Sequence, residues 1–152
     1  MFGQLGNSGS PPELKLEIQD YLRDVVPLIE LIEREFQTWM DMGSEDATTL
    51  SLERDSDGQH AAVYLWRVGQ AATDFVQHEI IRPARRFHMA YSYCLEARAA
   101  AADLFREAAD LALIKDPGPK VGEANRKLLE ARRQWDRAVK ARKDLETRLA
   151  AL

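Results

Sequence analysis

The chain has 152 residues, the length of one domain, and its 45% hydrophobic and 30% charged residues are typical of a globular protein. No apolar run reaches the roughly 18 residues of a membrane-spanning helix, and the N-terminal residues lack the order of a signal peptide. We therefore expect a cytoplasmic protein without membrane insertion. The single cysteine, Cys94, excludes an internal disulfide.

The net charge of −4 conceals a gradient along the chain. Residues 1–58 hold 4 basic and 13 acidic side chains, residues 59–119 hold 7 of each, and residues 120–152 hold 10 basic and 5 acidic. The two ends are therefore expected to attract each other. A basic end can also bind nucleic acid or an anionic surface, but its interleaved acids favour a solvated or intramolecular role.

Residues 1–12 are rich in Gly, Ser and Pro and predict a flexible tail, followed by a single helical-bundle domain over residues 13–152. Ser10 is suited to cap a helix whose first turn holds Pro11, Pro12 and Glu13. Pro27 interrupts the helix that follows and predicts a kink rather than two helices. Apolar residues then recur in steps of three and four on one face: Ile18, Leu22, Val25, Ile29, Ile32, Phe36 and Trp39.

Residues 43–58 are acidic and predict an irregular connection, after which Asp57 and Gly58 open a helix that runs to about Leu113. Pro83 divides this helix, so we expect either a sharp bend there or an elongated molecule. The first half has a broad apolar face: Tyr64, Leu65, Trp66, Val68, Ala72, Phe75 and Val76. The second half has a narrower seam: Ile80, Ala84, Phe87, Tyr91, Cys94, Arg98, Ala101, Phe105, Ala108 and Ala112.

The sequence KDPGPK at residues 115–120 ends that helix, because two prolines flanking a glycine cannot continue it. The last helix carries a regular seam: Val121, Ala124, Leu128, Ala131, Trp135, Ala138, Arg142, Leu145, Leu149 and Leu152. Its alanines, facing Ala101 and Ala108, predict that the last two helices pack as an antiparallel hairpin.

These patterns predict an all-α fold: an elongated antiparallel bundle of three long helices, two of them kinked at proline, with coiled-coil-like seams. The sequence leaves open whether the seams pair within one molecule or between molecules.

Four basic side chains in steps of three and four make a candidate site for an anion or an acidic partner. They are His78, Arg82, Arg85 and Arg86. The favoured alternative is that they pair with the acidic first helix, at Glu30, Glu33 and Glu35. On a continuous helix His78 and His88 point about 80° apart, so both are expected at the surface or in a groove.

Metal and catalytic patterns are weak, and we predict no cofactor. No glutamate is followed three residues later by histidine, as di-iron bundles require, and His78-Glu79 is completed by Arg82 where a zinc helix needs a second histidine. Cys94 falls on an apolar seam and is expected to be a buried hydrophobe rather than a nucleophile.

A metal-dependent nucleotide hydrolase of helical type remains an alternative. The residues in question are acid pairs at helical spacing, Glu30 with Glu33 and Glu107 with Asp110. Such a site needs the two pairs to face each other across adjacent helices. Glu33 and Asp110 lie off the seams, which counts against it.

The sequence favours a non-catalytic helical interaction or assembly module, a subunit or adaptor of a larger complex whose partner is another protein or a second copy. A nucleic-acid-binding subunit that uses the basic last helix is the alternative. Its candidate face is Arg126, Arg132, Arg133, Arg137 and Lys140, with Lys127, Arg142 and Lys143 beside it.

Overall fold

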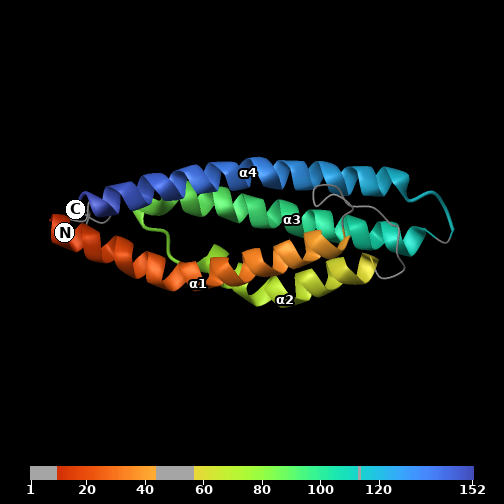
Figure 1. Ribbon diagram of the computed structural model, residues 1–152, viewed down its shortest axis with the longest axis horizontal. Coiled ribbons are helices and arrows are strands. Elements are labelled where there is room, and N and C mark those ends of the chain that lie inside the picture. The colour runs from red at the N-terminus through yellow and green to blue at the C-terminus, as the bar shows by residue number, and fades with distance from the viewer. Residues whose placement is uncertain (1–9, 44–56, 113) are drawn as a thin grey trace.

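The computed structural model describes residues 10–43, 57–112 and 114–152, which form four long helices in antiparallel order (Figure 1). These are α1 (Pro11–Gly43), α2 (Asp57–Gln77), α3 (Arg85–Leu111) and α4 (Gly118–Ala150), with a short 3-10 helix, η1 (Arg82–Ala84), before α3. The all-α prediction is confirmed, and the described residues contain no strand. The predicted number of three long helices is wrong, because the second predicted helix is two.

Helix α1 begins where its capping residue predicts. The Ser10 hydroxyl accepts a hydrogen bond from the Glu13 backbone N–H at 3.4 Å. Pro11 and Pro12 therefore belong to the helix, not to the predicted tail, and residues 1–9 lie outside the described residues. Pro27 stays inside one continuous helix whose ribbon bends near its middle (Figure 1). The predicted seam faces the core, with Ile18, Val25, Ile29, Ile32 and Trp39 buried.

The chain reverses direction between α2 and α3, so the sharp-bend alternative at Pro83 is the right one. Pro83 has no backbone N–H and disfavours helical geometry in the residue before it. Helix α2 ends at Gln77, and Ile81 is extended, with φ −84° and ψ 148°. Helix α3 then packs antiparallel to α2 instead of extending it (Figure 1).

Helices α3 and α4 form the predicted antiparallel hairpin and make the most extensive helix–helix contact in the fold. The five alanines that predicted it are all buried: Ala101, Ala108, Ala124, Ala131 and Ala138. Because alanine has no side chain beyond Cβ, these rows let the two helices approach closely. In the turn before α4, the Gly118 backbone N–H donates to the Asp116 carboxylate at 2.9 Å.

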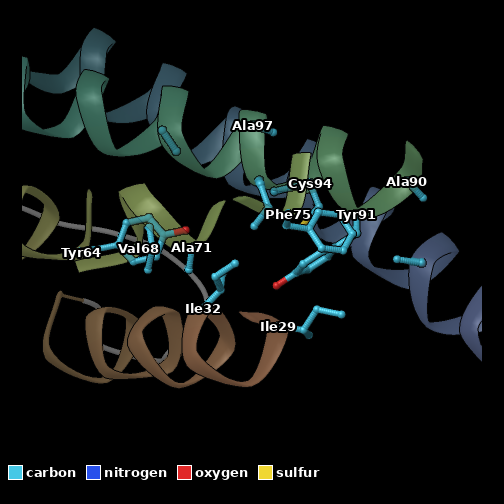
Figure 2. Close-up of a cluster of buried hydrophobic side chains, with 14 of the residues drawn as sticks. Ile29, Ile32, Tyr64, Val68, Ala71, Phe75, Ala90, Tyr91, Cys94 and Ala97 are labelled. Carbon is cyan, nitrogen blue, oxygen red and sulfur yellow. The ribbon is translucent and has the colours of Figure 1, made fainter. Parts of the chain in front are cut away.

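The core lies between the two helical hairpins, α1 with α2 and α3 with α4. Figure 2 shows Ile29 and Ile32 of α1 and Phe75 of α2 facing Tyr91 and Cys94 of α3. Two residues of the broad apolar face predicted on α2 do not join this core, since Trp66 and Val76 are exposed. None of the described helices is both long and apolar enough to cross a membrane.

Candidate interaction surfaces and the buried polar network

A buried ion pair joins α1 to α3. Arg98, only 3% exposed, donates from Nη1 to Glu33 Oε2 at 2.5 Å and from Nη2 to Oε1 at 3.1 Å. The Tyr91 hydroxyl donates to the same Glu33 Oε2 at 2.6 Å. The guanidinium carbon of Arg98 lies 3.7 Å from the ring centroid of Phe36, so an aromatic face covers the charge. The sequence favoured pairing of Glu33 with the arginines at positions 82, 85 and 86. In the structure Glu33 pairs with Arg98 instead.

Burial and the contacts of the network shift the pKa values of Arg98 and Tyr91. Burial is the largest single influence on the pKa of Arg98 and lowers it, but the hydrogen bonds to Glu33 and the nearby charges of Cys94, Glu33 and Tyr64 together raise the pKa above its usual value. Burial raises the pKa of the Tyr91 hydroxyl, and the charge of Glu33 raises it further. Burial also raises the pKa of the Cys94 thiol to about 11, so the thiolate that reacts as a nucleophile is scarce. Cys94 is thus a buried hydrophobe, as predicted.

His78 and His88 converge on one ring, contrary to the sequence prediction, because the chain reverses between them. The ring centroid of Tyr21 lies 5.5 Å from that of His78 and 6.0 Å from that of His88. His88 is 1% exposed rather than a surface residue, and its Nδ1 accepts from the Tyr21 hydroxyl at 2.8 Å. Its Nε2 faces the Val76 carbonyl at 3.5 Å, which assigns the ring hydrogen to Nε2. Burial lowers the pKa of His88.

The four residues of the predicted anion site lie in three different segments of the fold. His78 lies in the connection after α2, where Nε2 is 3.2 Å from Asp24 Oδ2 and Nδ1 is 2.8 Å from the Glu79 carbonyl. The hydrogen bond between the His78 ring and the Asp24 carboxylate lowers the pKa of Asp24. Arg82 belongs to η1, and Arg85 and Arg86 begin α3, all three exposed. Since residues 78–81 are not helical, the helical spacing that grouped these side chains does not apply, and an anion-binding role stays a prediction.

The predicted basic face of α4 is solvent-exposed. Arg132 lies 4.0 Å from Asp136 and Lys127 lies 3.6 Å from Glu130, so these two cations have acidic neighbours on their own helix. Within the part of the chain that the structure describes, the remaining cations of the predicted basic face, on the exposed side of α4, form no ion pair. They are Arg126, Arg133, Arg137 and Lys140.

The outer face of α2 is a surface that the sequence did not single out. We call the residues Gln59, Ala62, Trp66, Gly69, Thr73 and Val76 the outer α2 stripe. Its central side chain, Trp66, is 81% exposed, and Val63 beside it is 45% exposed. Arg67 and Asp74, two exposed charged residues of α2, lie to one side of the stripe: Arg67 is 3.5 Å from Glu35 of α1, and Asp74 accepts a hydrogen bond from Gln70. The stripe itself is uncharged over its whole length.

A groove of about 760 Å³ lies between α1 and α4. Phe36, Met40 and Trp135 are among its apolar lining residues. Four ionisable side chains reach it from three helices, but they pair with one another, Glu33 with Arg98 and Arg132 with Asp136. The groove therefore offers a ligand no charge that lacks a counter-charge.

The acid pairs of the hydrolase alternative are engaged elsewhere. Glu33 binds Arg98, and Glu107 lies 3.0 Å from Lys120 of α4. Among residues 10–43, 57–112 and 114–152, no group of three His, Cys, Asp or Glu side chains is arranged to hold a metal ion.

No protein-family model, curated protein or solved structure matches this chain. The surfaces described above are therefore the basis for inferring its function. Among them, the outer α2 stripe departs furthest from ordinary helix surfaces, because a helix that packs one apolar face on a core normally presents polar and charged residues on the other.

Proposed function

We propose that this protein is a non-catalytic helical assembly module that docks onto another polypeptide through the outer α2 stripe. The observation that carries the proposal is Trp66, 81% exposed in the middle of an uncharged helix face. Contiguous exposed apolar surface on a protein commonly marks an interaction site. Tryptophan is also the residue type most often found at the energetic centre of protein interfaces.

The free energy available at this face is large enough to matter. Burying a tryptophan side chain removes on the order of 150–250 Å² from water, which contributes roughly 4–6 kcal/mol before the costs of association. Val63, one helical turn before Trp66, is 45% exposed, and Val76, at the far end of the outer α2 stripe, is 47% exposed. The helix beneath is held firmly by Tyr64, Val68 and Phe75, all buried, so docking requires no refolding of α2.

The interior supports a structural rather than a catalytic role. Its ionisable groups are matched to each other, as in the bidentate contact between Arg98 and Glu33 and the neutral hydrogen bond between Tyr21 and His88. Such pairs fix the register of packed helices. They also leave these groups less available to act on a substrate.

Site-specific photo-crosslinking tests the proposal. A photoreactive amino acid is placed at Gln70, beside the outer α2 stripe, and in a matched variant at Arg137 on the outer face of α4. In the cells that make the protein, we expect a discrete protein adduct from position 70 and none from position 137. The adduct should disappear when Trp66→Asp is added. Adducts at position 137 alone would contradict the proposal.

Nucleic-acid binding through α4 is the second candidate, because Arg126, Arg133, Arg137 and Lys140 are exposed without ion-pair partners among the described residues. Binding of this kind weakens steeply with salt. A titration with duplex and single-stranded oligonucleotides at about 50 and 200 mM salt therefore separates the candidates. The α2 proposal expects no complex at either salt concentration, and a complex abolished by Arg133→Glu with Arg137→Glu would favour the rival.

A further inference from the structure

We infer that the partner seated on the outer α2 stripe is a second copy of this chain, paired antiparallel so that Trp66 of each copy packs over Gly69 of the other. The inference rests on the proposed function and names its partner. It is carried by the spacing of the stripe, by the sizes of its side chains and by its lack of charge.

The spacing is that of a coiled-coil seam. Residues 59, 62, 66, 69, 73 and 76 alternate in steps of three and four, as the a and d positions of heptads do. Helix α2 thus carries two seams. The inner one is buried in the bundle and consists of Ala61, Tyr64, Val68, Ala71 and Phe75. The outer one has the same repeat and lacks a partner among the described helices.

The side-chain sizes select the antiparallel arrangement. A two-fold axis through the middle of the stripe brings Gln59 opposite Val76, Ala62 opposite Thr73, and Trp66 opposite Gly69 of the other copy. The one bulky residue of the stripe therefore meets the residue that lacks a side chain, twice in the dimer. A parallel pair would instead put Trp66 against Trp66 and leave a void between two glycines.

Gly69 can receive the indole. A Cβ placed on Gly69 would meet no atom within 4 Å, so the surface there is open. Trp66 lies one helical turn away and projects into solvent. The large side chain and the position without a side chain are thus adjacent on one face, which is what a self-complementary two-fold interface requires.

The charge distribution permits self-association. Two identical faces repel each other when they carry net charge, and the outer α2 stripe carries none. The positions that flank the stripe are uncharged too: Val63, Leu65, Gln70, Ala72 and Gln77. Helix α2 also lies along one edge of the bundle, on the side away from α4 (Figure 1).

The size of the contact predicts a reversible dimer. From Gln59 to Val76 the stripe extends about 26 Å at 1.5 Å per residue. Two tryptophans contribute on the order of 300–500 Å² to the buried surface, and the whole contact stays near the lower limit of about 1,200 Å² for specific interfaces. We therefore expect a dissociation constant in the micromolar range, roughly 1–100 μM.

Sedimentation equilibrium of the full chain from about 1 to 500 μM, a range that brackets this constant, tests the inference. Wild type should shift reversibly from the monomer mass of 17.3 kDa to twice that value. Trp66→Ala should weaken association at least about tenfold. Ile114→Ala, which removes another strongly exposed apolar side chain from the connection between α3 and α4, should leave the dissociation constant within about twofold of wild type.

Gly69→Leu separates this interface from general stickiness. The extra apolar side chain would strengthen nonspecific adhesion, but in the proposed dimer it occupies the space over residue 69 that Trp66 of the other copy needs, and it should weaken the dimer at least about tenfold. The swap of Trp66→Gly with Gly69→Trp restores a large residue opposite a small one. It should recover association that either single change loses.

Three results would overturn the inference: a monomer throughout the concentration range, a dimer unaffected by Trp66→Ala, or a dimer strengthened by Gly69→Leu. A monomer that still forms a crosslink to a different protein from position 70 would remove the second copy as partner and leave the proposed function standing. A monomer without any crosslink at position 70 would remove both.

Discussion

Helices α2 and α4 both pack one seam against the core, but their outer faces differ in kind. Of the 33 residues of α4, 15 are charged, whereas the 21 residues of α2 contain only Asp57, Arg67 and Asp74. The outer face of α4 is kept soluble by alternating charges. The outer α2 stripe carries no charge, and its largest side chain is Trp66, which is exposed to solvent. The contrast indicates that the packing of a helix against the core does not determine which residues occupy its solvent-facing side.

The largest expected effect compares two tryptophans. Trp39 is buried and stacks on Tyr64 with ring centroids 4.8 Å apart, whereas Trp66 projects into solvent. Trp39→Ala should lower the free energy of unfolding by about 3–5 kcal/mol. Trp66→Ala should change it by less than about 0.5 kcal/mol in the monomer. Urea unfolding at about 1 μM protein, at the bottom of the expected range for dimer dissociation, measures both, and a large loss for Trp66→Ala would place that side chain in the fold itself.

The next effect lies within α4. Ala131 is buried in the close contact with α3, and Arg133 faces solvent. Ala131→Leu should overpack that contact and lower the free energy of unfolding by about 1–3 kcal/mol. Arg133→Leu should change it by less than about 0.5 kcal/mol. Equal losses from the two variants would show that the outer face of α4 also contributes to folding.

The two glycines of α2 should respond in opposite directions. A Cβ at Gly58 would come within 2.6 Å of the Ala109 Cβ, so Gly58→Ala must push α2 away from α3 and should cost about 1–2 kcal/mol. Gly69 is exposed with open space around it, so Gly69→Ala should stabilise the monomer by about 0.5–1 kcal/mol through helix propensity. Thermal unfolding of both variants checks the signs. Destabilisation by Gly69→Ala would reveal a contact at the outer face within the monomer.

The smallest effect concerns the end of α2, where His88 stacks on Phe75 and faces the Val76 carbonyl. Burial lowers the pKa of His88, with the nearby charge of His78 adding to the shift. The unfolded chain, with a histidine pKa of about 6.5, therefore binds the proton more tightly. The stability that depends on an uncharged His88 should therefore be fully present above pH 6.5, and the free energy of unfolding should decline as the pH falls from there towards 5.

His88→Asn supplies the control, because its amide oxygen accepts from the Tyr21 hydroxyl but does not titrate. Melting temperatures between pH 5 and pH 7.5 should vary less for this variant than for wild type. The lowered pKa of Asp24 acts in a separate window, below its usual value of 3.8. An unchanged pH profile would mean that His88 does not control this decline.

Sequence periodicity was sufficient for the inner seams and insufficient for the chain reversal. The alanine rows predicted the α3–α4 hairpin because close helix contact has a local signature. The break before Pro83 has no such signature, since proline accompanies both kinks and helix ends. Whether the chain bends or reverses depends on α2 packing against α1, which is a long-range preference.

The polar network was only half visible in the sequence. Arg98 stood on an apolar seam, and a buried arginine requires a carboxylate. Its partner Glu33 lies 65 residues away, so no local spacing identified it. Trp66 was noticed as apolar, but α2 has two interleaved seams of equal repeat. Only the fold shows which of them faces the core.

The beginning of α1 and the end of α4 lie at the same end of the bundle (Figure 1). If two such bundles join through antiparallel α2 helices, the chain ends of the two copies point in opposite directions. The dimer is then an elongated particle with one pair of chain ends at each of its two tips. A parallel pair would instead place all four chain ends at the same end of the dimer. Dyes attached at residue 152 of two mixed samples would report the difference as weak or strong energy transfer.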